Sequence, residues 1–277
     1  MRQFVCETPL DKNGLLVLEK KDFHYLRNVL RLSVGDMINV RIENSSEKIF
    51  GTNMTICKID DARKKIVLQK CAEISSEASA ENFGEKNLCA LNAKYFLFQF
   101  LPKPQKLELI VRQATECGVS FVVPIVGEYT QGGCEKTLQN AARYERIIRE
   151  ARQQSGSAVE TKILPAQSLD AALEFWRRET CDFSAQEKRA LVLYERCENT
   201  TAFGNAFFAN ESDSEKFDLK KIKACALAVG CEGGISPAEF ARLLDAGFCG
   251  VHFNTNILRC ETAALYGMAA VQSLIEN

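Results

Sequence analysis

The sequence predicts an α/β protein with a mostly parallel sheet, preceded by a small β domain. From residue 94 onward, short apolar runs alternate with amphipathic helical patterns, which is typical of parallel strands joined by crossover helices. Residues 1–72 differ, because short strand-like runs follow one another there with turn residues between them. A third observation is the apolar run at residues 224–229, which is too short for a helix and leads into a glycine-rich turn.

In the small β domain we expect four strands and one short helix. The strands are expected at residues 15–18, 37–41, 49–59 and 65–69. The helix is expected at residues 22–31, because Phe23, Leu26, Val29 and Leu30 recur with the spacing of one helix face.

The larger domain is expected to follow a linker. Residues 73–92 are polar and aperiodic, which indicates a linker and places the domains at residues 1–72 and 93–277. Apolar runs predict strands at residues 95–100, 119–126, 161–164, 190–194, 224–229 and 249–253. Helical patterns lie at residues 107–117, 139–154, 169–176 and 236–246 and near the C-terminus. Residues 196–220 are polar and aperiodic apart from Phe203, Phe207 and Phe208, and a connection of this length is usually mobile or functional.

The composition is that of an ordinary globular protein. Hydrophobic residues make up 46% of the chain and charged residues 26%. No apolar run approaches the ~20 residues needed to cross a membrane, and the N-terminus does not resemble a signal peptide, so we expect a cytoplasmic location. Twelve cysteines are scattered without a Cys-x-x-Cys spacing, and only two histidines are present, so we expect reduced thiols and no metal site.

Basic residues are concentrated in the first domain. Residues 1–72 contain 13 Lys and Arg against 9 Asp and Glu, whereas residues 73–277 contain 22 against 27. A basic module beside a more acidic domain suits contact with nucleic acid. Arg2, Arg27 and Arg31 are candidate phosphate contacts, and a solvated surface is an equally good interpretation.

A second basic stripe follows the helix expected at residues 139–154. Arg143, Arg146, Arg149 and Arg152 recur every third residue, so we expect the outward side of this helix to be cationic. Contact with RNA is one interpretation. The other is a solvated helix stabilised by intrahelical ion pairs.

The glycine-rich turn is the main candidate for a ligand site. The run Gly230-Cys231-Glu232-Gly233-Gly234 precedes Ser236-Pro237-Ala238-Glu239, in which the Ser, Pro and Glu predict a capped helix start. The strand at residues 249–253 ends in a second loop, and ligands of parallel sheets bind where the strands end. The turn does not have the spacing of a dinucleotide or phosphate loop, so an ordinary tight turn is the alternative.

Taken together, the two loops resemble a known family. The glycine turn, followed further along by Ile257-Leu258-Arg259-x-Glu261-Thr262-Ala263, resembles the C-terminal signature of the SPOUT methyltransferases. Within that class it is similar to the ribosomal RNA small subunit methyltransferase E family. Near the N-terminus, Met1-Arg2-x-Phe4 and His24-x-Leu26-x-x-Val29-Leu30-Arg31, followed by Gly35-Asp36, resemble the PUA-like barrel of the same family.

The resemblance implies a fold, a cofactor and a reaction. The implied fold is a C-terminal trefoil-knotted SPOUT domain with a small N-terminal PUA-like β-barrel that contacts RNA, assembled as a homodimer. The implied reaction uses S-adenosylmethionine to methylate N3 of a uridine in 16S rRNA of the small ribosomal subunit. The implied cofactor contacts are Leu193, Glu195, Gly230, Glu232, Gly233, Gly234, Asn254, Leu258 and Thr262.

The same resemblance places the chemistry at two residues near the C-terminus. Arg259 is expected to orient the uracil oxygens or to stabilise the N3 anion as charge develops. Glu261 is expected to anchor Arg259 or to act as the base. The structural alternatives are a helix cap or ion pair for Arg259 and a carboxylate favoured by the helix dipole for Glu261.

The sequence departs from the family pattern at several positions. Cys231 replaces a proline of the turn, and Gln113, Ser157 and Asn256 stand where relatives carry cations. The pattern on the methyl-donor side is mostly present, whereas several cations on the RNA side are not. Two other interpretations therefore stay open: a non-catalytic RNA-binding protein that keeps the fold, and a nucleotide-binding Rossmann enzyme with an unknotted sheet.

Overall fold

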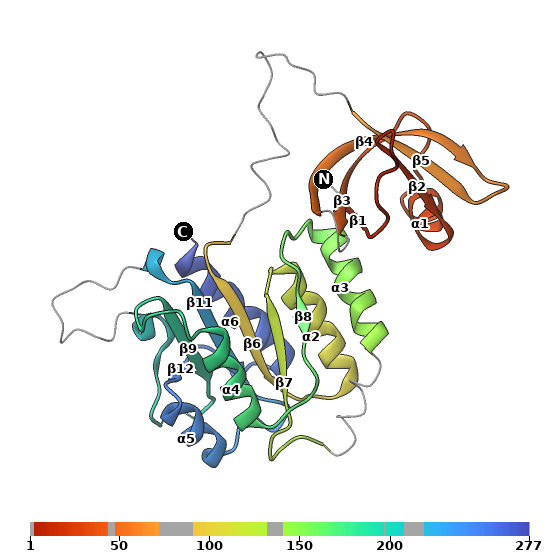
Figure 1. Cartoon of the computed structure of the whole chain (residues 1–277). Coiled ribbons are helices and arrows are strands. Elements are labelled where there is room, and N and C mark those ends of the chain that lie inside the picture. The colour runs from red at the N-terminus through yellow and green to blue at the C-terminus, as the bar shows by residue number, and fades with distance from the viewer. Residues whose placement is uncertain are drawn as a thin grey trace. The chain divides into compact units, whose positions relative to one another are not determined.

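The computed structural model describes residues 3–43, 48–71, 91–131, 141–196, 198–207 and 219–276. The chain forms two compact units, one built on a five-stranded sheet and the other on a seven-stranded sheet (Figure 1). Arg2 and most of the expected linker at residues 73–92 lie outside the described residues.

In the first unit, five strands form a mostly antiparallel sheet. The strands are β1 (Gln3–Cys6), β2 (Leu15–Glu19), β3 (Met37–Glu43), β4 (Lys48–Asp60) and β5 (Lys65–Lys70), in the order β1-β3-β4-β5-β2. Only the β1–β3 pair is parallel among these pairings. Along β2, Leu16 and Leu18 are buried and their neighbours are not, so one face of the sheet forms the core. The four predicted strands are confirmed, and β1 is an addition.

The helix after β2 is not regular. It begins as α1 (Lys20–His24) and continues as a π-helical segment, η1 (Tyr25–Val29), after which the Leu30 N–H donates to the Tyr25 carbonyl at 2.9 Å. Leu26 is fully buried, as predicted, but Val29 is 55% exposed. A π turn holds more residues than an α turn, so it rotates Val29 away from the core. The prediction that Val29 shares the buried face is wrong for this reason.

Seven parallel strands form the sheet of the second unit. They are β6 (Lys94–Phe100), β7 (Phe121–Ile125), β8 (Lys162–Ile163), β9 (Lys188–Leu193), β10 (Thr201–Ala202), β11 (Ala224–Val229) and β12 (Cys249–His252). Their order is β10-β12-β9-β11-β6-β7-β8, and every neighbouring pair is parallel. All six residues of β11 are buried, as expected for a strand covered on both faces. The predicted α/β class with a mostly parallel sheet is confirmed.

Helices cover both faces of this sheet. The helices α2 (Pro104–Glu116), α3 (Ala141–Ser155) and α6 (Cys260–Ile275) pack on the face that contains Tyr95 and Leu97 of β6. The helices α4 (Leu169–Glu179) and α5 (Pro237–Asp245) pack on the face that contains Phe96 and Phe98. The predicted start of α5 is confirmed, because Ser236 and Glu239 each accept a hydrogen bond from the main-chain N–H of the other.

Two further expectations are wrong. Arg152, grouped with the outward arginines of α3, is only 4% exposed. Residues 152–156, at the C-terminal end of α3, group with the first compact unit, so the period of the helix alone does not determine how exposed Arg152 is. Residues 196–220 are also not uniformly irregular, because β10 pairs with β12 and the 3₁₀ helix η3 (Phe203–Phe207) places Phe203 and Phe207 in the core. Phe208 lies outside the described residues.

Two structural features are not found among the described residues. No helix there has both the length and the apolar character needed to span a bilayer. No group of three or more His, Cys, Asp or Glu side chains there is arranged to hold a metal ion. The cysteines of these ranges form no disulfide.

Candidate active site

Three neighbouring strands place their carboxyl ends at one edge of the large sheet. The central strand of the three, β9, pairs in parallel with β11 on one side and with β12 on the other. The loops after these strands line a cavity of about 170 Å³. The lining residues are Leu193, Tyr194, Glu195, Val229, Gly230, Cys231, Gly234, Val251, His252, Phe253, Thr255, Asn256, Ile257, Leu258, Cys260 and Ala263. The predicted meeting of the glycine turn with the loop that leads to Arg259 is therefore confirmed.

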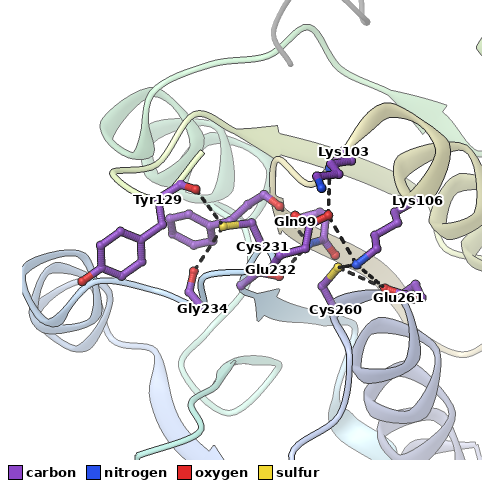
Figure 2. A network of polar contacts seen from close by, with 11 residues as sticks. Gln99, Lys103, Lys106, Tyr129, Cys231, Glu232, Gly234, Cys260 and Glu261 are labelled. Atoms are coloured by element: carbon purple, nitrogen blue, oxygen red, sulfur yellow. Dashed lines mark hydrogen bonds and ion pairs between the residues drawn. The ribbon is translucent and has the colours of Figure 1, made fainter. Parts of the chain in front are cut away.

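The glycine turn is held by contacts that only glycine permits. A Cβ added to Gly230 would lie 2.7 Å from the carbonyl carbon of Gly234, so the two ends of the turn are nearly in contact. Gly234 itself has φ of +80°, a left-handed conformation that side chains disfavour. The Gln99 amide, buried at the end of β6, donates to the Gly230 carbonyl at 3.0 Å and to the Val229 carbonyl at 3.3 Å (Figure 2).

The loop after β7 supports the other side of the turn. The Cys231 thiol donates to the Tyr129 carbonyl at 3.4 Å (Figure 2). A Cβ added to Gly233 would lie 2.9 Å from the Tyr129 Cβ. One carboxylate oxygen of Glu239, the third residue of α5, accepts the Glu128 N–H at 2.8 Å. The turn is thus fixed between α5, β6 and this loop before any ligand binds.

A polar cluster connects the two loops of the cavity. The Lys106 ammonium in the first turn of α2 lies 3.3 Å from Glu232 Oε1 and 3.4 Å from Glu261 Oε2 (Figure 2). Glu232 Oε1 also accepts the main-chain N–H of Lys103 at 3.2 Å, and the Cys260 thiol donates to Glu261 Oε2 at 3.2 Å. The glycine turn, α2 and the start of α6 therefore converge on one ammonium group.

The surroundings of this cluster favour ionised carboxylates. Burial opposes the ionisation of Glu261, but its own main-chain N–H, the Cys260 thiol and Lys106 outweigh burial and hold its pKa below the ordinary value. Burial likewise opposes the ionisation of Glu232, and main-chain N–H groups and Lys106 lower its pKa. Burial raises the pKa of the Cys260 thiol to about 12, so this group is a protonated donor at neutral pH.

The predicted cofactor contacts divide into two sets. Leu193, Glu195, Gly230, Gly234 and Leu258 line the cavity. The others do not, and they are Glu232, Gly233, Asn254 and Thr262. In that second set the glutamate belongs to the polar cluster, the glycine packs against the loop after β7, and the Asn and Thr side chains are exposed.

The two predicted catalytic residues follow the cavity-lining Leu258. Arg259 is the N-cap residue of α6, is exposed, and makes no capping hydrogen bond with its side chain. The carboxylate of Glu261 contacts Lys106 and Cys260. A helix-capping side chain, one of the two structural roles considered for Arg259, is therefore not observed.

The candidate RNA-binding arginines of the first unit have different surroundings. Arg27 donates to Asp61 at 3.3 Å and to the Leu32 carbonyl at 3.1 Å. Arg31 is exposed and has φ of +56°, where the chain leaves the π-helical segment. Of these two arginines, Arg31 is the more accessible to a phosphate.

The candidate arginines on α3 are exposed but partly engaged. Arg143 forms two hydrogen bonds with the Glu108 carboxylate, one of them at 2.7 Å, and Arg146 lies 3.7 Å from Glu150. Arg149 is exposed on the same helix. We refer to Arg143, Arg146 and Arg149 as the three exposed arginines of α3.

The sequence alone did not identify Gln99, Lys106 and Tyr129 as residues that contact the glycine turn. The one local signal was the polar Gln99, which interrupts the apolar run at residues 95–100. Lys106 follows the same strand, but nothing in its neighbourhood in the sequence marks it as a partner of residues far along the chain.

The chain is similar in sequence to RNA methyltransferases. Residues 90–272 match the family model described as an RNA methyltransferase domain. The chain is 27% identical over 282 residues to ribosomal RNA small subunit methyltransferase E 2 of Borreliella burgdorferi, covering 100% of this chain and 99% of that protein. It is 26% identical to ribosomal RNA small subunit methyltransferase E of Bacillus subtilis, covering 91% of this chain and 87% of that protein.

Solved structures give the same fold. The crystal structure of the Neisseria gonorrhoeae ribosomal RNA small subunit methyltransferase E bound to S-adenosyl methionine is similar with a TM-score of 0.70 at 20% identity, covering 99% of this chain and 98% of that chain. A methyltransferase structure from Legionella pneumophila is similar with a TM-score of 0.69 at 19% identity, covering 98% and 96%. With a family match that spans the whole seven-stranded sheet and the cavity at its edge, this chain belongs to the RNA methyltransferase domain family.

Proposed function

We propose that this protein transfers a methyl group from S-adenosylmethionine to N3 of a uridine in 16S rRNA of the small ribosomal subunit. The observation that carries the proposal is the cavity formed jointly by the glycine turn and the loop that leads into α6. Two further findings support it. The similar proteins from Borreliella burgdorferi and Bacillus subtilis are named ribosomal RNA small subunit methyltransferases, and the similar Neisseria gonorrhoeae structure contains S-adenosyl methionine.

The chemistry of the cavity lining suits this cofactor. Leu193, Val229 and Leu258 offer apolar contact for a purine ring and for the methylene groups of the methionine chain, and Gly230 leaves main-chain groups accessible. The Glu195 carboxylate lies close to Gly234, since a Cβ there would meet it at 2.5 Å, and it can accept hydrogen bonds from sugar hydroxyls or an ammonium. When bound, the cofactor supplies a methyl group on a positively charged sulfur.

The protein's own part in the reaction is to position the uracil and to stabilise charge. The target base must leave its stack or belong to a single-stranded loop, because N3 is hidden in a base pair. Arg259 stands between the lining residues Leu258 and Cys260 and has an exposed guanidinium. We assign to it the orientation of the uracil oxygens and the stabilisation of the N3 anion.

The remaining assignments follow the same family resemblance. Arg2, Arg27, Arg31 and the three exposed arginines of α3 are proposed RNA contacts, and residues 1–72 the RNA-binding domain. The trefoil knot and the PUA-like barrel stay predictions, as does the cytoplasmic location. A homodimer is supported by the partly exposed apolar side chains Leu109 of α2 and Leu265 and Tyr266 of α6, which a second copy would cover.

Two experiments test the proposal. Titration calorimetry of the purified protein with S-adenosylmethionine should give saturable binding, and absence of binding would favour the non-catalytic RNA-binding alternative. Mass mapping of 16S rRNA should then detect the loss of one N3-methyluridine in a strain from which the gene has been deleted. Retention of every methyluridine in that strain would remove the proposed reaction, whatever the result of the calorimetry.

A further inference from the structure

Lys106 contacts both loops of the cavity through one carboxylate on each. Glu232 belongs to the glycine turn after β11, and Glu261 to the first turn of α6, 29 residues further along the chain. The Lys106 ammonium lies 3.3 Å from the first carboxylate and 3.4 Å from the second (Figure 2). The side chains of all three residues are less than a third exposed. A single cation thus bridges two segments that the fold brings together only at this edge of the sheet.

The charge of Lys106 offsets the repulsion between two partly buried carboxylates, which an isolated surface ion pair does not do. Without the ammonium, two partly buried carboxylates would face each other, and like charges in such a place repel strongly because water screens them poorly. Partial burial works against the charge of Lys106, but Cys260 and the two carboxylates raise its pKa above the ordinary value, so it stays protonated at neutral pH. Glu232 has a second anchor in the Lys103 main-chain N–H, so the turn is tied to the start of α2 as well.

The residues joined by the bridge stand next to the cavity lining. Gly230 and Cys231 precede Glu232 on one wall, while Leu258 and Cys260 precede Glu261 on the other. A change in the separation of the two carboxylates therefore changes the width of the cavity itself.

We infer that Lys106 is a positioning residue that holds the glycine turn and the start of α6 at the separation required for cofactor binding. The effect on the ligand rests on the proposed function, whereas the effect on the two loops does not. The same contacts bear on Glu261, whose carboxylate is committed to Lys106 and Cys260. Glu261 then completes the bridge, and its role as the base that removes the N3 proton stays a prediction.

The test compares three variants with the wild-type protein. In Lys106→Met the apolar stem of the side chain is kept and the charge is lost, whereas in Lys106→Arg the charge is kept. Lys103→Met is the matched control, because only the main chain of Lys103 contacts Glu232. Amide hydrogen exchange of the ligand-free proteins should become about tenfold faster at residues 229–236 and 254–262 in Lys106→Met. The same exchange should stay at the wild-type rate in the control and be largely restored in Lys106→Arg.

Coupling to the carboxylates separates positioning from general packing. We expect Lys106→Met to weaken S-adenosylmethionine binding by about tenfold in calorimetry. In a Glu232→Gln/Glu261→Gln background, where no repulsion remains to be offset, the same change should alter the affinity by less than about twofold. An equal loss in both backgrounds would mean that Lys106 acts by packing alone and would overturn the inference.

The two proposals can fail separately. If the wild-type protein binds no S-adenosylmethionine, the proposed function is lost, and the hydrogen-exchange comparison still decides the role of Lys106. If Lys106→Met exchanges at the wild-type rate in both loops, the positioning role is wrong even where the cofactor binds normally.

Discussion

Replacing Gly230 by alanine is the most direct test of how the cavity is built. The added Cβ would lie 2.7 Å from the carbonyl carbon of Gly234, 2.8 Å from its Cα and 2.9 Å from its oxygen. These are main-chain atoms, so no side chain can rotate to relieve the contact and the turn itself must open. Overpacking of this kind costs about 1–3 kcal/mol of unfolding free energy. Since both glycines line the cavity, we also expect the affinity for S-adenosylmethionine to fall more than about tenfold, or about 1.4 kcal/mol.

Gly204 offers a matched control for this substitution. It lies in η3, has no left-handed φ, and an added Cβ there would meet no atom within 4 Å. Gly204→Ala should change the unfolding free energy by less than about 0.5 kcal/mol and leave the affinity unchanged. The two quantities are measured by urea unfolding and by calorimetry. A Gly230→Ala protein with wild-type stability and affinity would refute the close approach of Gly230 to Gly234 that underlies the proposed site.

Three further predictions concern pH, catalysis and RNA. Hydrogen bonds from Lys223 and Ser184 lower the pKa of Glu187 to about 2. The wild-type protein should therefore lose stability as the pH falls from about 4.5 toward 2. In acid unfolding, the Glu187→Gln protein should lose less stability over this range. Arg259→Gln should reduce kcat by about 100-fold and change the dissociation constant for S-adenosylmethionine by less than about twofold; an equal loss in both would place Arg259 in cofactor binding instead. Alanine at all three exposed arginines of α3 should weaken rRNA binding and flatten its salt dependence, whereas alanine at Arg177 and Arg178 of α4 should do neither; equal effects in filter binding would contradict a specific contact by α3.

Local patterns in the sequence were sufficient for most of the fold. Strand–helix alternation predicts the parallel sheet, and the Ser-Pro-x-Glu start of α5 has the capping hydrogen bonds that its spacing implies. Such features depend on residues close together in the chain. The predicted burial of Val29 was wrong, because a π-helical turn changes the helical period and no local pattern in the sequence indicates such a turn. The burial of Arg152 was missed because residues 152–156 group with the first compact unit, which a periodic pattern within one helix cannot indicate.

In the candidate site, only the meeting of the loops that follow the strands could be predicted from the sequence. The glycine turn and the loop before α6 were expected to meet, because parallel strands end at one edge. Their connection to α2 was not, because it depends on strand order: β11 pairs with β6, and α2 follows β6 directly. More than a hundred residues separate Lys106 from both of its carboxylate partners, so neither periodicity nor spacing could relate them.

The strand order also explains how the Glu232 side chain can stabilise the glycine turn without lining the cavity. In the glycine turn the cavity is lined by Gly230, Cys231 and Gly234, while the Glu232 side chain is held by Lys106 and the main chain of Lys103. The carboxylate therefore contributes by fixing the backbone of its own turn against α2, the neighbour that β6 brings to this edge. We therefore expect Glu232→Gln to loosen the turn without removing a side chain that lines the cavity. Its loss of cofactor affinity should be smaller than that of Lys106→Met, because Glu232→Gln keeps the Lys106–Glu261 pair and leaves no two carboxylates to repel each other.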